Sequence, residues 1–169
     1  VAVYFVNLQD APRQGAAISG ISALAGIGFA GAAWWLYRSS KTGKLKLRDE
    51  MIAALDLKGD EKVLDIGAGR GLLAIAAARK LKSGKVTAVD LWRPEDLSGN
   101  SMDALKANAQ AEGVKIDAQN ADPRKLPFKD ASFDVVLSSY ALHRLDSQSQ
   151  RELALREIAR VLKPGGKAA

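Results

Sequence analysis

From residue 47 to the C-terminus, short apolar runs that predict strands alternate with stretches in which apolar residues recur every three or four positions, as in amphipathic helices. The predicted strands are Lys62–Ile66, Lys85–Val89, Val114–Ala118 and Phe133–Ser138, and the predicted helices are Leu47–Leu57, Gly71–Leu81, Ser101–Glu112 and Gln148–Leu162. Strands that alternate with helices of this length predict an α/β fold with a doubly wound parallel sheet, covered by helices on both faces.

The last residues of the chain predict an incomplete sheet. Helix Gln148–Leu162 runs into Lys163-Pro164-Gly165-Gly166, a turn after which a fifth strand is expected, and only Lys167-Ala168-Ala169 follow. A sheet that is truncated at this point exposes an edge unless further chain or a partner covers it. Because the chain also begins with Val1 rather than Met, we expect it to be a fragment of a longer protein.

The N-terminal third has a different pattern. Gln14–Tyr37 contains no charged residue, and as a helix it would be about 36 Å long, enough to span a bilayer. Trp34, Trp35 and Tyr37 gather at one end, as interface anchors do. We therefore predict an N-terminal flank (1–13), a single transmembrane helix (14–37), a basic juxtamembrane linker (38–46) and a globular domain (47–169).

The flanking charges predict the orientation of this span. Five cations lie just after it, and only Arg13 lies just before it; the five are Arg38, Lys41, Lys44, Lys46 and Arg48. By the positive-inside rule, the globular domain faces the cytosol, or the matrix or stroma of an organelle. Small residues share one helix face, which would let a membrane protein partner pack closely, although Gly and Ala are common in membrane helices anyway: Gly15, Ser19, Ser22, Ala23, Gly26, Ala30 and Ala33.

Charge and composition exclude several classes of function. The net charge is +6, but residues 1–46 hold five cations and one anion, so that only +2 belongs to the remaining chain. The basic excess therefore indicates a membrane flank rather than a nucleic-acid surface. There is no cysteine and only one histidine, so a disulfide framework is excluded and we expect no metal site.

The clearest motif follows the first predicted strand. Asp65-Ile66-Gly67-Ala68-Gly69-Arg70-Gly71 leads directly into a helix, and glycines at such a turn let the backbone bend sharply and approach a ligand. Dinucleotide-binding enzymes use G-x-G-x-x-G, whereas this turn has G-x-G-x-G with an acidic residue two positions before the first glycine. A nicotinamide-dependent oxidoreductase is therefore disfavoured.

This segment resembles motif I of the class I S-adenosylmethionine-dependent methyltransferases, which have a Rossmann-like fold. The resemblance implies S-adenosylmethionine as the cofactor, bound by Asp65, Gly67, Ala68, Gly69 and Gly71. Asp90 ends the second predicted strand 19 residues after Gly71 and, together with Leu91, matches the position that binds the ribose. A carboxylate suits that role because its two oxygens can accept from two vicinal hydroxyls.

Further segments resemble the family in the same order along the chain. Ala121 and Asp122, followed by Leu126-Pro127-Phe128, match the segment in which an acidic side chain and a neighbouring backbone amide bind the adenine. Phe133–His143 resembles the fourth strand and the turn that faces the reactive methyl, with Ser138 at the cofactor. Glu157–Gly166 resembles the helix and turn before the fifth strand. The amino-acid sequence of these segments is most similar to the branch of the family that methylates small or lipid-like acceptors.

The chemistry needs little from the protein beyond placement. Methyl transfer from a sulfonium is an in-line displacement, so proximity and orientation dominate. A general base is required only when the acceptor must lose a proton, and His143 is the candidate, with Tyr140 beside it. A structural turn is the alternative for His143, and a pocket wall is the alternative for Tyr140.

Two hypotheses follow. The first is a membrane-anchored methyltransferase that acts on a small or lipophilic acceptor. The second is an accessory subunit of a membrane complex that retains the fold, with or without activity, and assembles through its small-residue helix face.

Overall fold

In the computed structural model of the protein, the described residues are 11–169 except 94, 97 and 140; for 11–24, 40 and 41 only the backbone is described. Residues 1–10 of the predicted flank lie outside this range. The chain divides into two compact units, Val1–Lys46 and Leu47–Ala169. The catalytic motifs predicted from the sequence all fall in the second unit.

One helix, α1 (Ala11–Ala54), replaces three separately predicted segments. The segment 14–37, the basic linker 38–46 and most of the helix Leu47–Leu57 are continuous. Pro12 lies in the first turn, where its missing N–H is harmless, and no proline follows within the helix. The helix ends before Asp56, which takes a left-handed φ of 47°. The Lys167 ammonium then donates to the Leu55 carbonyl at 2.5 Å.

The transmembrane span predicted over 14–37 is not supported. Among the residues whose side chains are described, no helix is both long and apolar enough to cross a membrane. The described part of the predicted span, 25–37, is rich in Gly, Ala and Trp, which are far less apolar than Leu or Ile. The side chains of 14–24 lie outside the described set.

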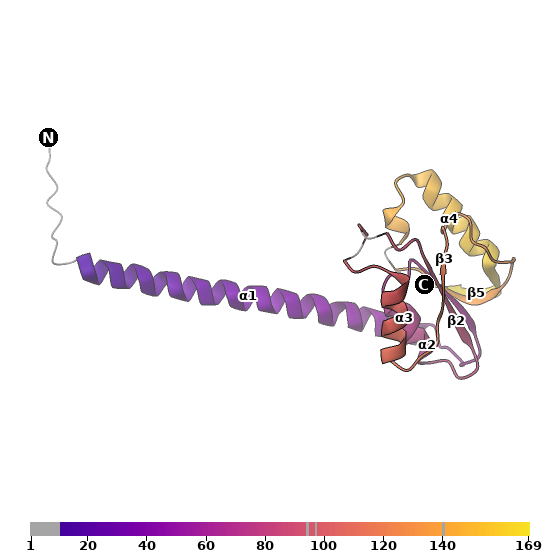
Figure 1. Ribbon diagram of the computed structural model, residues 1–169, viewed down its shortest axis with the longest axis horizontal. Coiled ribbons are helices and arrows are strands. Elements are labelled where there is room, and N and C mark those ends of the chain that lie inside the picture. The colour runs from indigo at the N-terminus through magenta and orange to yellow at the C-terminus, as the bar shows by residue number, and fades with distance from the viewer. Residues whose placement is uncertain (1–10, 94, 97, 140) are drawn as a thin grey trace. The chain divides into compact units, whose positions relative to one another are not determined.

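The second unit contains a five-stranded sheet with the order β3-β2-β1-β4-β5, and the recorded pairings between its strands are parallel. The predicted Rossmann-like α/β fold is therefore confirmed. Figure 1 shows α2 and α3 on one side of the sheet and α4 on the other. The strands are β1 (Lys62–Ile66), β2 (Lys85–Asp90), β3 (Asp117–Asn120), β4 (Phe133–Leu137) and β5 (Leu162–Ala168), and the helices are α2 (Leu72–Ala78), α3 (Met102–Ala111), a short 3-10 turn η1 (Leu142–Arg144) and α4 (Gln148–Val161).

The fifth strand corrects the prediction of a sheet that stops before it. β5 pairs with β4 through Phe133 opposite Leu162 and Val136 opposite Ala168, with a register shift between them. The Lys163–Gly166 segment was predicted as a turn. It lies within β5, at the position of this register shift. Gly166 is required there, since a Cβ atom would lie 2.9 Å from the Asp134 carbonyl oxygen.

β3 begins three residues later than predicted. After α3, the Gly113 N–H donates to Gln110 O and the Val114 N–H donates to Ala109 O, the paired bonds of a Schellman cap. Gly113 supplies the left-handed residue of this cap, with a φ of 67°. The apolar Val114 therefore belongs to the helix end rather than to the strand.

Two apolar clusters bury the two faces of the sheet. One contains Leu73 of α2 and Leu105 of α3, together with Ile52 and Leu55 from the N-terminal part of the second unit. The other contains Ile158 and Val161 of α4, together with Phe133 of β4. This two-sided burial explains why β1 and β4 read as continuous apolar runs. It leaves the carboxyl ends of the strands as the edge where a ligand can bind.

Candidate cofactor site

The order of the strands locates the site. β2 and β3 lie on one side of β1, and β4 and β5 lie on the other, so the direction of winding reverses between β1 and β4. Ligands of open parallel sheets bind beyond the carboxyl ends of the strands at such a switch point. The glycine turn, Asp90 and Ser138 follow the ends of β1, β2 and β4, as predicted.

The glycine turn has the backbone that its sequence requires. Gly67, Gly69 and Gly71 have φ values of 71°, 53° and 91°, which side chains disfavour. The N–H groups of Gly67 and Ala68 both donate to Val89 O, at 2.8 and 3.1 Å, and fix the turn to β2. A Cβ atom on Gly67 would lie 2.1 Å from Cβ of Ala141, so the chain after β4 also closes on this turn.

Asp65 is buried beneath the turn, with 2% of its surface exposed. Its carboxylate accepts the N–H of Ala74 at 2.9 Å and so joins the end of β1 to α2. Burial, with a smaller contribution from Asp90, raises the pKa of Asp65 to about 7. The hydrogen bond shows a positioning role for Asp65 in the turn.

Asp90 is fixed by two backbone donors. The N–H of Gly69 donates to one carboxylate oxygen at 2.8 Å, and the N–H of Trp92 donates to the other at 2.7 Å. A carboxylate has about four acceptor positions, so about two stay available for a pair of hydroxyl groups. Leu91, which the sequence places at the cofactor, is half-buried beside it.

Asp122 is engaged differently from the prediction. Its two oxygens accept from the N–H and the guanidinium of Arg124, at distances from 2.5 to 3.0 Å. Hydrogen bonding to Arg124 lowers the pKa of the Asp122 carboxyl. Pro123, which follows Asp122, has no N–H and cannot donate to a ligand. Ala121 is buried and donates its N–H to Asp90 O at 3.3 Å.

Helix α4 holds the segment that follows Asp122. Glu157 accepts the N–H of Leu126 at 2.7 Å, and Arg160 donates to the carbonyls of Leu126 and Phe128 at 3.1 and 2.8 Å. Arg160 also forms ion pairs with Glu157 and Asp130, each at 2.7 Å. The two resembling segments, Leu126–Phe128 and Glu157–Gly166, are therefore parts of one hydrogen-bonded network.

The edge after β4 holds fewer described contacts. The Ser138 hydroxyl is buried and finds no hydrogen-bond partner among the described residues. His143 lies in η1 and is exposed, and Tyr140 lies outside the described residues. Arg144 pairs with Asp96 at 3.2 Å, which ties η1 to the segment after β2. No group of three His, Asp or Glu that could hold a metal ion is found in the described part of the chain.

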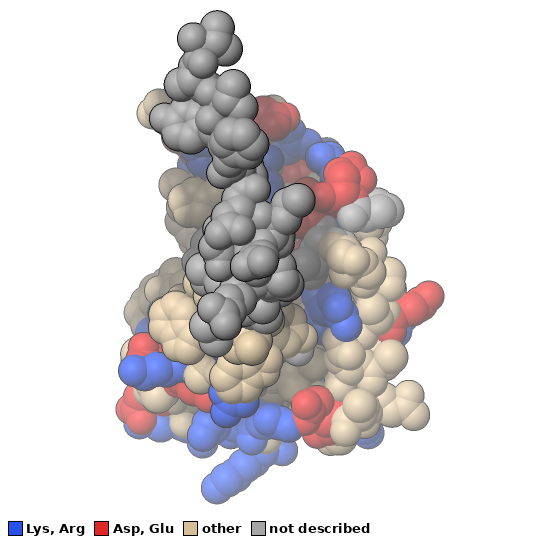
Figure 2. All heavy atoms as spheres, turned by 90° about the vertical axis from the view of Figure 1, so that its left-hand side faces the viewer, with Lys and Arg blue, Asp and Glu red and all other residues tan. Residues whose placement is uncertain are grey.

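These features fit S-adenosylmethionine. The three glycines of the turn have no Cβ atoms, so a ligand can approach the backbone there. Asp90 keeps acceptor positions for ribose hydroxyls. The Ser138 hydroxyl is buried without a hydrogen-bond partner among the described residues, and a bound ligand could supply one. Figure 2 shows Lys and Arg side chains as well as Asp and Glu side chains on the face turned to the viewer. The arrangement defines a nucleoside-binding α/β domain of the methyltransferase type.

Comparison with known proteins identifies the family. Residues 63–166 match the family model described as a methyltransferase domain, and the chain therefore belongs to this family. Its cofactor is S-adenosylmethionine. The matched range runs from β1 into β5, so it includes the glycine turn, Asp90, Asp122 and Ser138.

Several relatives are similar over most of the second unit. A ubiquinone/menaquinone biosynthesis C-methyltransferase of Chromobacterium violaceum is 35% identical over 66% of this chain and 42% of that protein. The 27-O-demethylrifamycin SV methyltransferase of Amycolatopsis mediterranei is 35% identical over 73% and 43%. The crystal structure of the YcgJ protein from Bacillus subtilis has a TM-score of 0.59 and 32% identity, over 74% and 48%. The chain thus spans about half the length of these relatives, or less.

Two residues of the site were not predicted from the sequence. Trp92 donates hydrogen bonds to both Asp90 and Gly69, and the Arg124 guanidinium donates to the Asp122 carboxylate. The only sequence signal for Arg124 was its place two residues after an aspartate. For Trp92 the signal was an aromatic residue in an otherwise polar connection.

Proposed function

We propose that this chain carries the methyl-donor half of a methyltransferase that acts on a small or lipophilic acceptor. The observation that supports this most is Asp90, whose carboxylate is joined to the glycine turn at the switch point of the sheet. Two relatives are consistent with a small acceptor, since one is named for ubiquinone/menaquinone biosynthesis and another for 27-O-demethylrifamycin SV.

In this proposal the site has two sides. The donor side comprises the glycine turn Gly67–Gly71 and Asp90, and it binds and orients the cofactor. The acceptor side comprises residues 139–144, which follow Ser138 at the end of β4. S-adenosylmethionine supplies a methyl group that its sulfonium already activates, so the protein mainly has to align the acceptor with it.

On the acceptor side, His143 serves as the base when the acceptor is a hydroxyl group. The His143 side chain is exposed, and an imidazole nitrogen can accept the proton of an acceptor hydroxyl group. For a carbon acceptor activated as a phenolate or enolate, no base is needed at the moment of transfer. Tyr140 is proposed as a wall of the acceptor pocket.

The test has two stages. The full chain is first titrated with S-adenosylmethionine and, in parallel, with NADH; we expect saturable binding of the first and none of the second. It is then incubated with methyl-labelled S-adenosylmethionine and either an alkylated hydroquinone or a peptide mixture. Label in the hydroquinone supports the proposal. Absence of S-adenosylmethionine binding, or label only in peptides, would overturn it.

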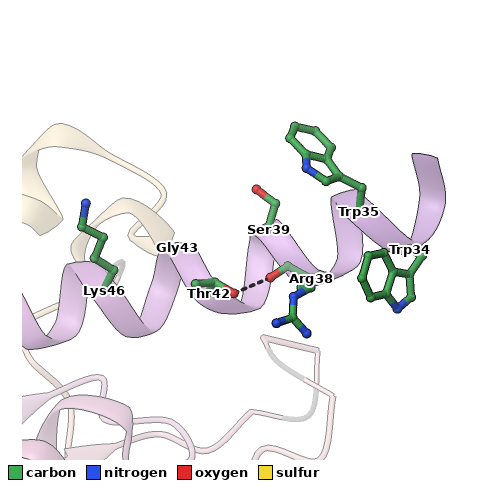
Figure 3. Close-up of a pocket in the computed structure, with 7 residues that line it drawn as sticks. All are labelled: Trp34, Trp35, Arg38, Ser39, Thr42, Gly43 and Lys46. Atoms are coloured by element: carbon green, nitrogen blue, oxygen red, sulfur yellow. Dashed lines mark hydrogen bonds between the residues drawn. The ribbon is translucent and has the colours of Figure 1, made fainter. Parts of the chain in front are cut away.

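We further propose that the exposed aromatic side chains of α1, which lie on more than one side of the helix, place the protein at an anionic membrane surface. Phe29 is 80% exposed, Trp34 62% and Trp35 63%, more apolar surface than a solvated helix normally shows. Figure 3 shows Trp34 and Arg38 on one side of the helix and Trp35 on the other, around a pocket that Lys46 also lines. The Arg38 guanidinium lies 5.6 Å from the Trp34 ring centroid. Aromatic rings beside cations are typical of contacts with lipid headgroups.

Vesicle sedimentation tests this placement. The full chain should sediment with vesicles of phosphatidylcholine and phosphatidylglycerol, and less with phosphatidylcholine alone. Trp34→Ser with Trp35→Ser should abolish sedimentation, whereas Leu153→Ser, which removes an exposed leucine of α4, should not. Equal behaviour of both variants would contradict the proposal. Recovery in a stable complex with a membrane protein would instead favour the accessory-subunit hypothesis.

A further inference from the structure

The connection that follows β2 contains an unusual tryptophan. Trp92 has a φ of 45°, in the left-handed region, and only 9% of its surface is exposed. A bulky side chain in this conformation is strained and persists only where surrounding contacts enforce it. Its ring packs in the apolar cluster that contains Leu73 and Leu105.

Three hydrogen bonds hold Trp92 in this left-handed conformation. The Trp92 N–H donates to the Asp90 carboxylate at 2.7 Å, and the indole Nε1–H donates to the carbonyl of Gly69 at 3.1 Å. The N–H of Gly69 donates to the other oxygen of Asp90 at 2.8 Å. Gly69, Asp90 and Trp92 thus form a closed ring of hydrogen bonds, which we call the Trp92 ring.

The Trp92 ring fixes both polar atoms of Gly69. Its N–H is held by a carboxylate and its carbonyl by the indole, so the residue in the middle of the glycine turn cannot rotate without breaking two bonds. The same contacts aim the carboxylate of Asp90. Because the left-handed φ turns the chain back, the Trp92 backbone and indole can reach Asp90 and Gly69 together.

We propose that Trp92 is a positioning residue for cofactor binding: it holds the glycine turn and the Asp90 carboxylate in the geometry that the cofactor requires. The proposal rests on the proposed function, since it assumes that Gly69 and Asp90 bind S-adenosylmethionine. It acts through those two residues. A tryptophan that served only to fill the core would pack equally well without its Nε1–H reaching the turn.

The decisive variant is Trp92→Phe, which keeps an aromatic ring in the core and removes the indole donor. It leaves the carbonyl of Gly69 without this partner, and we expect the dissociation constant for S-adenosylmethionine to rise about tenfold. The matched control is Val86→Ala, at the other end of β2, which also removes buried apolar volume but touches neither Gly69 nor Asp90. Urea unfolding of both variants measures how much stability each has lost.

A spectroscopic readout separates positioning from packing. The chain has three tryptophans, and two of them, Trp34 and Trp35, lie in the first unit. In a reference protein with Trp34→Phe and Trp35→Phe, Trp92 is the single tryptophan, and its emission should change on titration with S-adenosylmethionine with the same dissociation constant that calorimetry gives. A core tryptophan unconnected to the site would show no such change.

The outcomes are distinct. Weaker binding in Trp92→Phe than in Val86→Ala at similar loss of stability, together with the emission change, supports the proposal. Unaltered affinity of Trp92→Phe, or a silent Trp92 at cofactor saturation, overturns it while the proposed function stands. If the reference protein does not bind S-adenosylmethionine in calorimetry, the proposed function itself fails, and this inference fails with it.

Discussion

On the donor side, Gly69 and Asp90 are held by hydrogen bonds to each other and to a buried tryptophan, whereas on the acceptor side the His143 side chain is exposed. The donor side recognises a molecule common to a whole family, and the protein can build it in advance. The acceptor side must fit one particular substrate. We therefore expect the geometry of the donor side to determine which cofactor binds, and exposed residues such as His143 to select the acceptor.

The largest expected effect is on the donor side. Asp90→Ala removes the ribose acceptor and leaves the N–H groups of Gly69 and Trp92 without their partner, so binding of S-adenosylmethionine should weaken about 1,000-fold. Asp90→Asn, which keeps one acceptor oxygen, should lose less. Isothermal titration calorimetry measures both, and wild-type affinity in Asp90→Ala would break the distinction between the two sides.

Asp65 makes the donor side sensitive to pH. Its pKa is about 7 in the folded protein and ordinary in the unfolded chain, so the folded state binds the extra proton. The stability from this group is complete below about pH 4 and is lost as the pH rises through about 7, by up to about 4 kcal/mol.

Urea unfolding across this pH range measures the effect. The stability of the wild type relative to Asp65→Asn should fall between about pH 4 and about pH 8. Asp60→Asn, which replaces an exposed carboxylate outside the Arg160 network, serves as the control for general effects of charge. Parallel curves for the wild type and Asp65→Asn would show that burial does not raise this pKa.

Substitutions of Arg160 test whether the hydrogen-bonded network of α4 stabilises the segment Leu126–Phe128. Arg160→Ala removes hydrogen bonds to the carbonyls of Leu126 and Phe128 and two ion pairs, and should lower the free energy of unfolding by about 2 kcal/mol. Arg160→Lys should recover only part, because an ammonium cannot reproduce the planar fork. Arg156→Ala, on the same helix, is the control. An equal loss in both alanine variants would contradict the network.

The smallest expected effect is on the acceptor side. His143→Gln should leave the affinity for S-adenosylmethionine unchanged and lower kcat about tenfold for a hydroxyl acceptor, since water can replace part of an exposed base. With a carbon acceptor, kcat should not change. Steady-state kinetics with both acceptors measure this, and loss of cofactor affinity in His143→Gln would mean that the two sides are not separate.

Much of the second unit was predictable because its signals are local. β1 was predicted at its observed bounds, since a strand buried on both faces leaves a short apolar run between a polar turn and a glycine-rich one. The left-handed glycines of the turn and the acidic end of β2 are likewise predicted by short motifs of consecutive residues. Sequence therefore placed the glycine turn directly after β1 and Asp90 at the end of β2.

The errors have a common physical cause. β5 depends on pairing with β4, about 30 positions earlier in the chain, and its Pro-Gly-Gly segment has the composition of a turn. The left-handed φ of Trp92 is enforced by Asp90 and Gly69, so no local propensity predicts it. The continuity of α1 was missed because a change from apolar to basic composition was taken as a boundary. In each case contacts or helix propagation override the local pattern.

If Asp122 binds the adenine amine, as the sequence predicts, the Asp122–Arg124 pair gives the adenine end of the site its own substitute for the ligand. The guanidinium already satisfies the carboxylate, so an incoming amine exchanges one set of hydrogen bonds for another and gains only their difference. Asp122 would then contribute little to the strength of binding while still selecting for an amine over a carbonyl group. Such an exchange also favours dissociation of the used cofactor, because Arg124 restores the hydrogen bonds of the Asp122 carboxylate as the cofactor leaves. Selectivity without tight retention suits a site that must empty itself in every catalytic cycle.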